Sequence, residues 1–319
     1  MSNNTDTVAI VVSGLAKHFG AVRAVDGIDF DVREGESFGF LGPNGAGKTT
    51  TVRMLTGVLE PTEGTATIEG HVIRTEALRS RAHLGIVPEE SNVYLDLSVW
   101  QNVMLMAELH GVPRRERCEN ANRLLESLGL AERRKQKART LSKGLRQRLM
   151  LCTALVTGPE ILFLDEPTSG LDVQSARLMR EIVRERNQRG LTVFLTTHNM
   201  DEAEEMCSRL AIINQGRIAA IDTPDGLRGV VRSRQYVEVV FEGDPLNGPD
   251  LKAIPGVTQV SSQAGRFHLY TEAPGRVAAE AVRYADAKGR QIAHICTRKP
   301  SLEEVYIHIT GQEEPEASK

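Results

Sequence analysis

The sequence predicts an α/β protein with buried parallel strands, followed by a smaller α+β domain. Two strongly apolar runs, at 161–164 and 192–195, lie on either side of a charged helical segment at 173–189. This is the pattern of buried parallel strands joined by a helix. At 319 residues, the chain is long enough for one full core and a smaller second one.

Strands and a helical insert are expected before these two apolar runs. Short apolar stretches alternate with turn residues at 8–12, 28–32, 37–41 and 65–68, which is typical of strands. Residues 97–130 instead carry apolar side chains at helical spacing, as in Val99, Val103 and Met106. We therefore expect a helical insert that begins at about residue 97.

The part of the chain after Gly226 has a different pattern. Strands are expected at 236–242, 257–261, 267–271 and 291–296, with one helix at 276–288. Ser301 and Glu304 form a capping-box pattern, in which each side chain satisfies a free backbone amide at a helix start. The sequence thus predicts a separate α+β domain over about 233–311.

Composition and charge limit the classes of function. The chain has 40% hydrophobic and 25% charged residues and a formal net charge of -3. This balance is ordinary for a soluble globular protein and predicts no general attraction to nucleic acid. The polar N-terminus lacks a signal pattern, and no run of about 18 uncharged apolar residues follows. Any link to a membrane is therefore expected to pass through a partner.

The four cysteines indicate a reducing compartment. Cys118, Cys152, Cys207 and Cys296 are scattered without CxxC spacing. Neither a zinc site nor a disulfide framework is indicated by that spacing. We expect a cytoplasmic protein.

Residues 42–49, Gly-Pro-Asn-Gly-Ala-Gly-Lys-Thr, fit the P-loop pattern GxxxxGK[ST] between a strand-like and a helix-like run. Glycines let the backbone wrap closely around phosphates, and the amides at the helix start point at the negative charge. Lys48 is expected to reach the β- and γ-phosphates, and the Thr49 hydroxyl to ligate Mg²⁺. The motif predicts an ATP site with contacts from Gly42, Asn44, Gly45, Gly47, Lys48, Thr49 and Thr50.

An acidic pair, Asp165 and Glu166, ends the apolar run at 161–164. At the end of a buried strand, one carboxylate can hold a metal ion and the other can polarise a water for in-line attack. We assign Asp165 to Mg²⁺ and Glu166 to the water.

Residues 141–146, Leu-Ser-Lys-Gly-Leu-Arg, resemble the signature of ABC cassettes, usually LSGGQ followed by a basic residue. Ser142 and Gly144 match, whereas Lys143 and Leu145 depart from the pattern. Residues 169–172, Ser-Gly-Leu-Asp, resemble the D-loop of the same family, and residues 196–198, Thr-Thr-His, resemble its H-loop. The order and spacing of these segments also match the family.

The resemblance implies a P-loop NTPase fold: a RecA-like core with an antiparallel β part and a helical insert at about 97–158, all within 8–228. It implies a head-to-tail homodimer that encloses two ATP molecules, each between one P-loop and the partner's signature. Ser142 and Gly144 would complete the opposite site, His198 would approach the γ-phosphate, and Asp172 would link the two sites. A partner is needed because one P-loop leaves a face of the γ-phosphate without hydrogen-bond donors. The N-terminus of a second helix can supply those donors.

Two further positions are assigned only through the resemblance. Phe19 stands where the family places an aromatic ring on the adenine, although a core phenylalanine is the alternative. Glu89 stands where the family usually has a glutamine that touches Mg²⁺ and couples the site to the membrane subunit. A carboxylate can still ligate the metal.

The C-terminal domain, which ends with Pro300, Ser301 and Leu302 before Glu303 and Glu304, is similar to the extension of ABC-2 type exporter ATPases. This implies an ATPase on the inner face of the cell membrane that drives a separate integral-membrane permease of the ABC-2 type. Two alternatives stay open: an ABC ATPase that acts on ribosomes or DNA, and an ABC importer ATPase. The cargo is expected to depend on the membrane partner.

Overall fold

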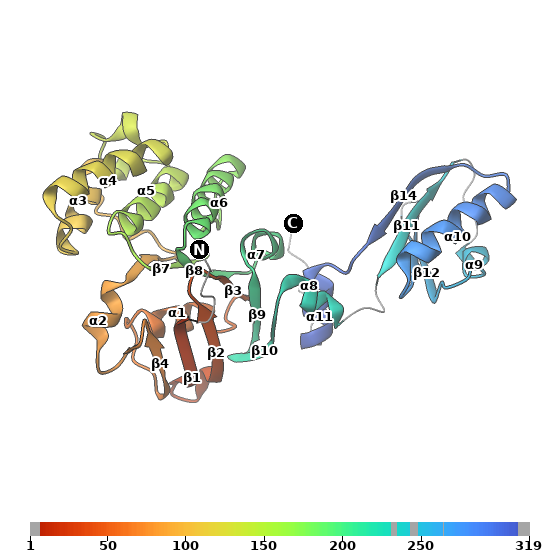
Figure 1. Cartoon of the computed structure of the whole chain (residues 1–319), viewed down its shortest axis with the longest axis horizontal. Helices are drawn as coiled ribbons and strands as arrows, with labels where there is room; N and C mark the ends of the chain where they lie inside the picture. Colours follow the sequence, from red (N-terminus) through yellow and green to blue (C-terminus); the bar gives the residue numbers. More distant parts are fainter. Residues whose placement is uncertain (1–6, 231–234, 243–247, 264, 312–319) are drawn as a thin grey trace. The chain divides into compact units, whose positions relative to one another are not determined.

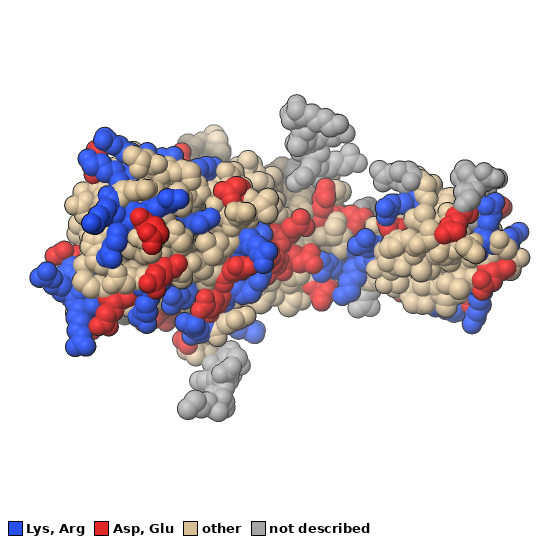
Figure 2. Space-filling model, turned by 90° about the horizontal axis from the view of Figure 1, so that it is seen from above, with Lys and Arg blue, Asp and Glu red and all other residues tan. Residues whose placement is uncertain are grey.

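The computed structural model describes residues 7–230, 235–242, 248–263 and 265–311. By its contacts the chain divides into two compact units, Met1–Ile221 and Asp222–Lys319 (Figure 1). In the part of the chain that is described, no helix combines the length and apolar character needed to cross a membrane. Acidic and basic side chains are intermixed over the face drawn in Figure 2.

The first unit contains a six-stranded sheet in the order β10-β9-β3-β8-β7-β6. Strand β3 pairs in parallel with β8 and β9, and β7 pairs in parallel with β6 and β8. The strands are β3 (Ser37–Leu41), β6 (Leu84–Val87), β7 (Ile161–Asp165), β8 (Thr192–Thr197), β9 (Arg209–Asn214) and β10 (Arg217–Asp222). Every residue of β3, β7 and β8 is buried, as expected for parallel strands covered on both faces. The α/β prediction is confirmed.

A second, four-stranded sheet of this unit has the order β2-β1-β4-β5, and its pairs β1/β2, β1/β4 and β4/β5 are antiparallel. Its strands are β1 (Val8–Phe19), β2 (Val22–Arg33), β4 (Glu63–Ile68) and β5 (His71–Val72). Strands β1 and β2 are longer than the predicted stretches 8–12 and 28–32. Register shifts along their pairing, as between Val12 and Leu15, break the apolar alternation that the prediction used.

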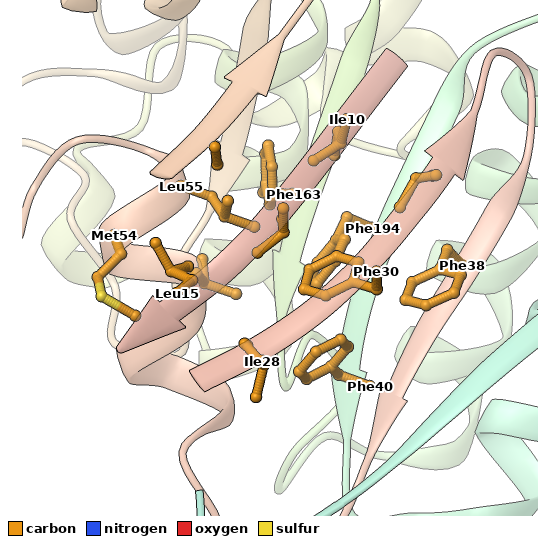
Figure 3. Packing of buried hydrophobic residues seen from close by; sticks show 14 of the residues in the cluster. Ile10, Leu15, Ile28, Phe30, Phe38, Phe40, Met54, Leu55, Phe163 and Phe194 are labelled. Carbon is orange, nitrogen blue, oxygen red and sulfur yellow. The ribbon is translucent and has the colours of Figure 1, made fainter. Parts of the chain in front are cut away.

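An aromatic core joins the two sheets. Phe30 of β2 lies among Phe38 and Phe40 of β3 and Phe194 of β8, with ring centroids 5.0–6.0 Å from it (Figure 3). Phe163 of β7 extends the cluster at 5.2 Å from Phe194. Rings at these separations bury large apolar areas and fix the two sheets relative to each other.

Helices cover the sheets and form the insert. They are α1 (Lys48–Leu55), α2 (Ala77–Ala82), α3 (Val99–Leu109), α4 (Arg114–Ser127), α5 (Lys143–Leu155), α6 (Val173–Gln188) and α7 (Met200–Met206), with short 3-10 turns η1 (Ala131–Arg133) and η2 (Ala138–Thr140). The helical insert and the helix between the apolar strands are therefore present. Helix α3 begins with a capping box of Ser98 and Gln101, a sequence pattern that the prediction overlooked.

The second unit contains a four-stranded sheet in the order β12-β13-β11-β14. Its strands are β11 (Tyr236–Phe241), β12 (Gln259–Gln263), β13 (Arg266–Tyr270) and β14 (Ile292–Arg298), and its helices are α8 (Pro224–Gly229), α9 (Gly248–Leu251), α10 (Pro274–Ala287) and α11 (Leu302–Thr310). The buried side chains of α10 form one core with Val237, Val239, Phe267 and Leu269 of the sheet. The Ser301 and Glu304 capping box is confirmed at the start of α11.

The predicted division by role, nucleotide binding in 8–228 and an accessory domain in 233–311, stays a prediction. Its boundary residue 233 lies outside the described residues. Helix α9 was not predicted, and β12 begins two residues later than the predicted 257–261.

Candidate active site

The P-loop connects the end of β3 to the start of α1. Gly47 takes φ 108°, a left-handed conformation that favours glycine, and a Cβ there would lie 2.5 Å from the carbonyl oxygen of Ala24. A Cβ on Gly42 would collide with the carbonyl oxygen of Ile213. The loop can therefore follow this tight path only with glycine at both positions.

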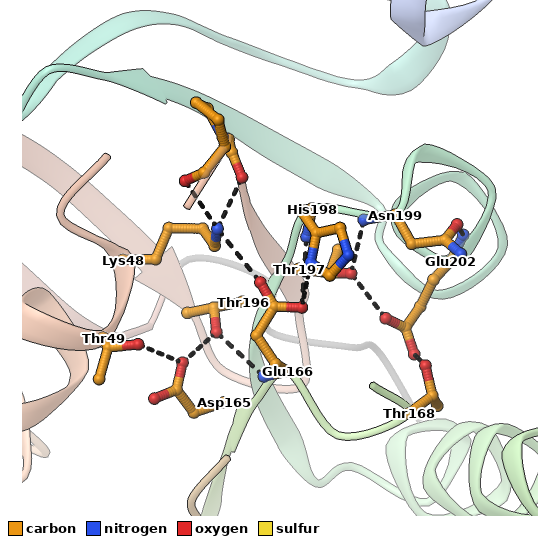
Figure 4. Close-up of polar contacts among 12 residues, drawn as sticks. Lys48, Thr49, Asp165, Glu166, Thr168, Thr196, Thr197, His198, Asn199 and Glu202 are labelled. Atoms are coloured by element: carbon orange, nitrogen blue, oxygen red, sulfur yellow. Dashed lines mark hydrogen bonds and ion pairs between the residues drawn. The ribbon is translucent and has the colours of Figure 1, made fainter. Parts of the chain in front are cut away.

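Lys48, the first residue of α1, is buried beneath this loop. Its Nζ donates hydrogen bonds to the carbonyl oxygens of Gly42 at 2.6 Å and Pro43 at 3.1 Å. The same Nζ pairs with Glu166 Oε1 at 3.1 Å (Figure 4). The ammonium group thus links the predicted phosphate loop to the predicted water-polarising acid.

The acidic pair lies where parallel strands β7 and β8 end together. Thr49 Oγ1 donates to Asp165 Oδ1 at 3.2 Å, and Thr196 Oγ1 donates to the same carboxylate oxygen. A hydroxyl beside a carboxylate offers the hard oxygen ligands that Mg²⁺ prefers, so the residues present fit this ion.

Glu166 is held in an uncommon backbone conformation, with φ 48°. Its amide donates to the carbonyl oxygen of Thr196 at 3.0 Å, which pins the residue at the end of β8. A non-glycine residue at positive φ costs free energy and is found where the surrounding structure demands it. The carboxylate of Glu166 consequently turns toward Lys48 on one side and His198 on the other (Figure 4).

His198 follows directly after β8. Its Nδ1 lies 2.8 Å from Glu166 Oε2, and its backbone amide donates to the same oxygen at 3.4 Å. The side chain of His198 is about half exposed, so its ring is also open to a ligand. The predicted residues Lys48, Thr49, Asp165, Glu166 and His198 therefore form one contact network.

Glu202, which was not predicted as a site residue, supports this network from α7. Only 1% of its surface is exposed, and its carboxylate accepts hydrogen bonds from Thr168 Oγ1 and Thr197 Oγ1, both at 2.7 Å. Burial raises the pKa of Glu202; the two threonine hydrogen bonds lower it by less, and the charge of Glu166 raises it further. Asn199, which caps α7 by accepting from the Glu202 amide at 3.0 Å, was a sequence signal for a helix start here.

The predicted signature and D-loop lie side by side. Ser142 is the N-cap of α5 and accepts a hydrogen bond from the Leu145 amide at 3.3 Å. A Cβ on Gly144 would lie 2.5 Å from Ser175 Oγ and 3.2 Å from Asp172 Oδ2, so α5 approaches the start of α6 closely. Asp172 caps α6 by accepting from the Ser175 amide at 2.8 Å, and this hydrogen bond is the main reason that its pKa is lowered.

A cavity of about 240 Å³ opens at the P-loop. Its lining residues are Ala24, Pro43, Asn44, Gly45, Gly47, Lys48, Thr49, Thr50, Glu89 and Glu166. Glu89 therefore faces the predicted nucleotide site. Within the described residues, Phe19, Ser142 and Gly144 do not line this cavity; Phe19 is 51% exposed at the end of β1, beneath the Lys17 ammonium at 5.4 Å.

Comparison with known proteins shows to which family the chain belongs. The family described as ABC transporter matches residues 25–169. The linearmycin resistance ATP-binding protein LnrL of Bacillus subtilis is 33% identical over 93% of this chain and 97% of its own. The Nod factor export ATP-binding protein I of a Rhizobium species is 36% identical over 96% and 98%, and the daunorubicin resistance ATP-binding protein DrrA3 of Streptomyces coeruleorubidus is 35% identical over 96% of each chain.

Solved structures agree in fold. An ATP-binding subunit of an ABC transporter superposes with a TM-score of 0.66 at 28% identity and covers 70% of this chain and 92% of its own. The protein cbiO1 of Clostridium perfringens gives a TM-score of 0.63 at 26% identity over 70% and 92%. With its P-loop, acidic pair and histidine in one network, the chain belongs to the ABC transporter family, as one of its ATP-binding and ATP-hydrolysing cassettes.

Proposed function

We propose that this cassette is the ATPase subunit of an ABC-2 type exporter. The observation that carries the ATPase role is the network in which Lys48 and His198 contact the two oxygens of one carboxylate, that of Glu166. The named roles of the relatives, Nod factor export and resistance to linearmycin and daunorubicin, support export as the transport direction.

Lys48 has a double role in this proposal. In the structure, its ammonium lies 3.1 Å from the Glu166 carboxylate and neutralises it. When the ammonium instead binds the β- and γ-phosphates, the carboxylate of Glu166 loses its cation and becomes free to orient the attacking water. His198 then holds the other side of Glu166 and approaches the γ-phosphate. Phosphate binding would thus activate the base.

The remaining site residues surround the nucleotide. Thr49 and Asp165 would hold Mg²⁺, which neutralises charge that develops on the phosphates, and Glu89, which lines the same cavity as Thr49, would be a further ligand. Asn44, Gly45, Gly47 and Thr50 would contact the phosphates, and Phe19 would stack on the adenine.

A second copy of the chain would complete each site. The Ser142 hydroxyl accepts from the Leu145 amide and can still donate, and with the amides at the start of α5, including that of Gly144, it would cover the γ-phosphate of the opposing site. Asp172 would link the two sites. The dimer would sit on the inner face of the membrane and drive a separate ABC-2 type permease, with 8–228 binding nucleotide and 233–311 as the accessory domain.

The test of the hydrolytic role is Glu166→Gln. The amide keeps the size of the side chain but cannot take up a proton, so we expect ATP binding to persist while turnover falls by about 10²–10⁴-fold. Glu160→Gln is the matched control because Glu160 directly precedes β7, the strand that Glu166 follows, and its side chain is 59% exposed. Turnover in Glu166→Gln within a few-fold of the control would remove the proposed role.

Identification of a membrane chain that co-purifies from solubilised membranes tests export; ribosomes or DNA alone in the preparation would contradict it.

A further inference from the structure

The sheet of the second unit has a polar face whose role is unexplained. Val237 and Val239 of β11 join the apolar core with α10, so alternation along the strand turns Glu238 to the opposite face. Register places Glu238 directly opposite His268 of β13 and opposite Cys296 of β14, and it places His294 opposite Val240. The buried acid therefore lies between His268 of β13 on one side and His294 and Cys296 of β14 on the other.

The donor atoms converge on the Glu238 carboxylate. His294 Nε2 lies 3.4 Å and Cys296 Sγ 4.0 Å from Glu238 Oε1. One oxygen, one nitrogen and one sulfur from these three residues all lie within 4.8 Å of one another. His268 Nε2 lies 3.5 Å from the other oxygen, Glu238 Oε2. Ligand atoms around a tetrahedral zinc ion lie roughly 3.3–3.6 Å apart, given its bond lengths. Small side-chain movements would bring the three atoms to that spacing.

The positively charged side chain of Arg266 already contacts the Glu238 carboxylate. The guanidinium of Arg266 lies 2.8 Å from Glu238 Oε1, the same oxygen that His294 and Cys296 approach. The Arg266 side chain is 55% exposed, whereas that of Glu238 is 9% exposed. The arginine can therefore swing into water while the carboxylate stays in place, so an ion that binds Glu238 would displace it.

We propose that Glu238, His294 and Cys296 bind a divalent transition-metal ion of borderline softness, such as Zn²⁺, on this face of the sheet. Thiolate, imidazole and carboxylate together are a ligand set that suits such ions and not Mg²⁺ or Ca²⁺. His268 is a positioning residue that orients the carboxylate through its second oxygen. Three protein ligands leave a fourth position open to water or to another molecule. The spacing of cysteines cannot reveal this site because its ligands come from two strands and include a single thiol.

The experiment is a Co²⁺ titration of the untagged full chain without nucleotide. Cobalt occupies zinc sites, and a Co²⁺–thiolate bond gives an intense near-ultraviolet charge-transfer band that oxygen ligands at the P-loop do not produce. We expect this band to saturate at one Co²⁺ per chain and to vanish on addition of Zn²⁺. Cys296→Ser should abolish the band, and His294→Ala should weaken Co²⁺ binding at least tenfold. Cys118→Ser is the matched control because Cys118 is likewise partly buried but lies on α4.

Three outcomes decide the proposal. Absence of the band in the wild-type chain, or its persistence in Cys296→Ser, overturns the site. Loss of the band in Cys118→Ser also overturns it by assigning the thiolate to the first unit.

Arg266→Ala should bind Co²⁺ more tightly than the wild type, because the competing cation is gone; equal or weaker binding contradicts the displacement of Arg266. Melting temperatures measured without metal show whether each variant is folded. The titration uses no ATP, so its result is independent of the proposed transport function.

Discussion

At the scale of single residues, the candidate site holds charged and titratable side chains in fixed positions. The Glu166 carboxylate is buried and contacts two cationic or titratable groups, Lys48 and His198, and its own backbone is held at positive φ. The carboxylate is thereby held in the lining of the P-loop cavity, as the proposed role of Glu166 in orienting a water requires. Each contact is within hydrogen-bond distance, so small changes at single residues are expected to have large effects.

Glu89 is a further residue to test, because it lines the P-loop cavity together with Lys48 and Thr49. We expect Glu89→Gln to retain substantial ATPase activity, since the amide oxygen can still ligate Mg²⁺. Glu89→Ala should lose Mg²⁺-dependent turnover or its coupling to transport. Steady-state ATPase activity across a Mg²⁺ titration, for the chain alone and with its membrane partner, measures both. An alanine variant that behaves as the wild type would show that Glu89 is not a ligand.

Glu202 should make the stability of the protein depend on pH. Burial raises its pKa above the ordinary value of 4.5, so the folded chain holds this proton more tightly than the unfolded chain. The contribution of the residue to the free energy of unfolding is therefore largest in acid and falls as the pH rises from the ordinary pKa through the raised one. Glu202→Gln resembles the protonated acid but cannot titrate: its oxygen accepts from one threonine, and its amide NH₂ group donates to the hydroxyl of the other.

The difference in unfolding free energy, wild type minus Glu202→Gln, should thus decrease with pH in that window, by at most about 1.4 kcal/mol per pH unit. Denaturant unfolding at a series of pH values measures it. Asp201→Asn, an exposed change on the same helix, should give a curve parallel to that of the wild type. If Glu202→Gln gives an equally parallel curve, the raised pKa is wrong.

At the scale of elements, sequence patterns predicted the features that depend on residues close together in the chain. The P-loop and the Asp165 and Glu166 pair are adjacent in sequence to the elements that position them, so spacing alone located them. The bond from Thr168 to Glu202 spans 34 residues and depends on which strands pair, which the sequence does not show. The full length of β1 was missed because its apolar alternation is interrupted at Gly14 and at the register shifts that follow.

Helix α10 provides a test of packing within the second unit. Val277 is fully buried against the sheet, whereas Val282 on the same helix is 42% exposed. Val277→Ala removes two buried methyl groups and should lower the stability of this unit by about 2 kcal/mol. Val282→Ala makes the same chemical change in water and should alter stability by less than about 0.5 kcal/mol.

Hydrogen exchange of the β11 and β13 amides, followed by mass spectrometry, measures this effect. Fluorescence would not, because the single tryptophan of the chain, Trp100, lies on α3 in the first unit. Faster exchange in Val277→Ala than in Val282→Ala is the expected result. Equal exchange in the two variants would mean that α10 does not stabilise the sheet.

At the scale of the whole molecule, the proposed dimer would add donors to the P-loop cavity. The lining of this cavity comes from the P-loop, Thr50, Ala24, Glu89 and Glu166, and it includes no donors from α5. A dimer would supply them, and it should accumulate when hydrolysis is blocked. We expect Glu166→Gln to double its mass in light scattering when MgATP is added, and to remain monomeric with ADP.

Substitution of Ser142 decides whether the helix cap takes part in that dimer. Asp, Asn and Ser cap helices about equally well, so Ser142→Asp and Ser142→Asn both preserve the start of α5. The aspartate would place a negative charge against the γ-phosphate of the opposing site, whereas the asparagine would not. Added to Glu166→Gln, Ser142→Asp should therefore abolish the ATP-dependent dimer without loss of ATP binding, and Ser142→Asn should largely retain it. If the aspartate variant dimerises as readily as Glu166→Gln alone, Ser142 does not face the nucleotide of the partner, and the head-to-tail arrangement fails.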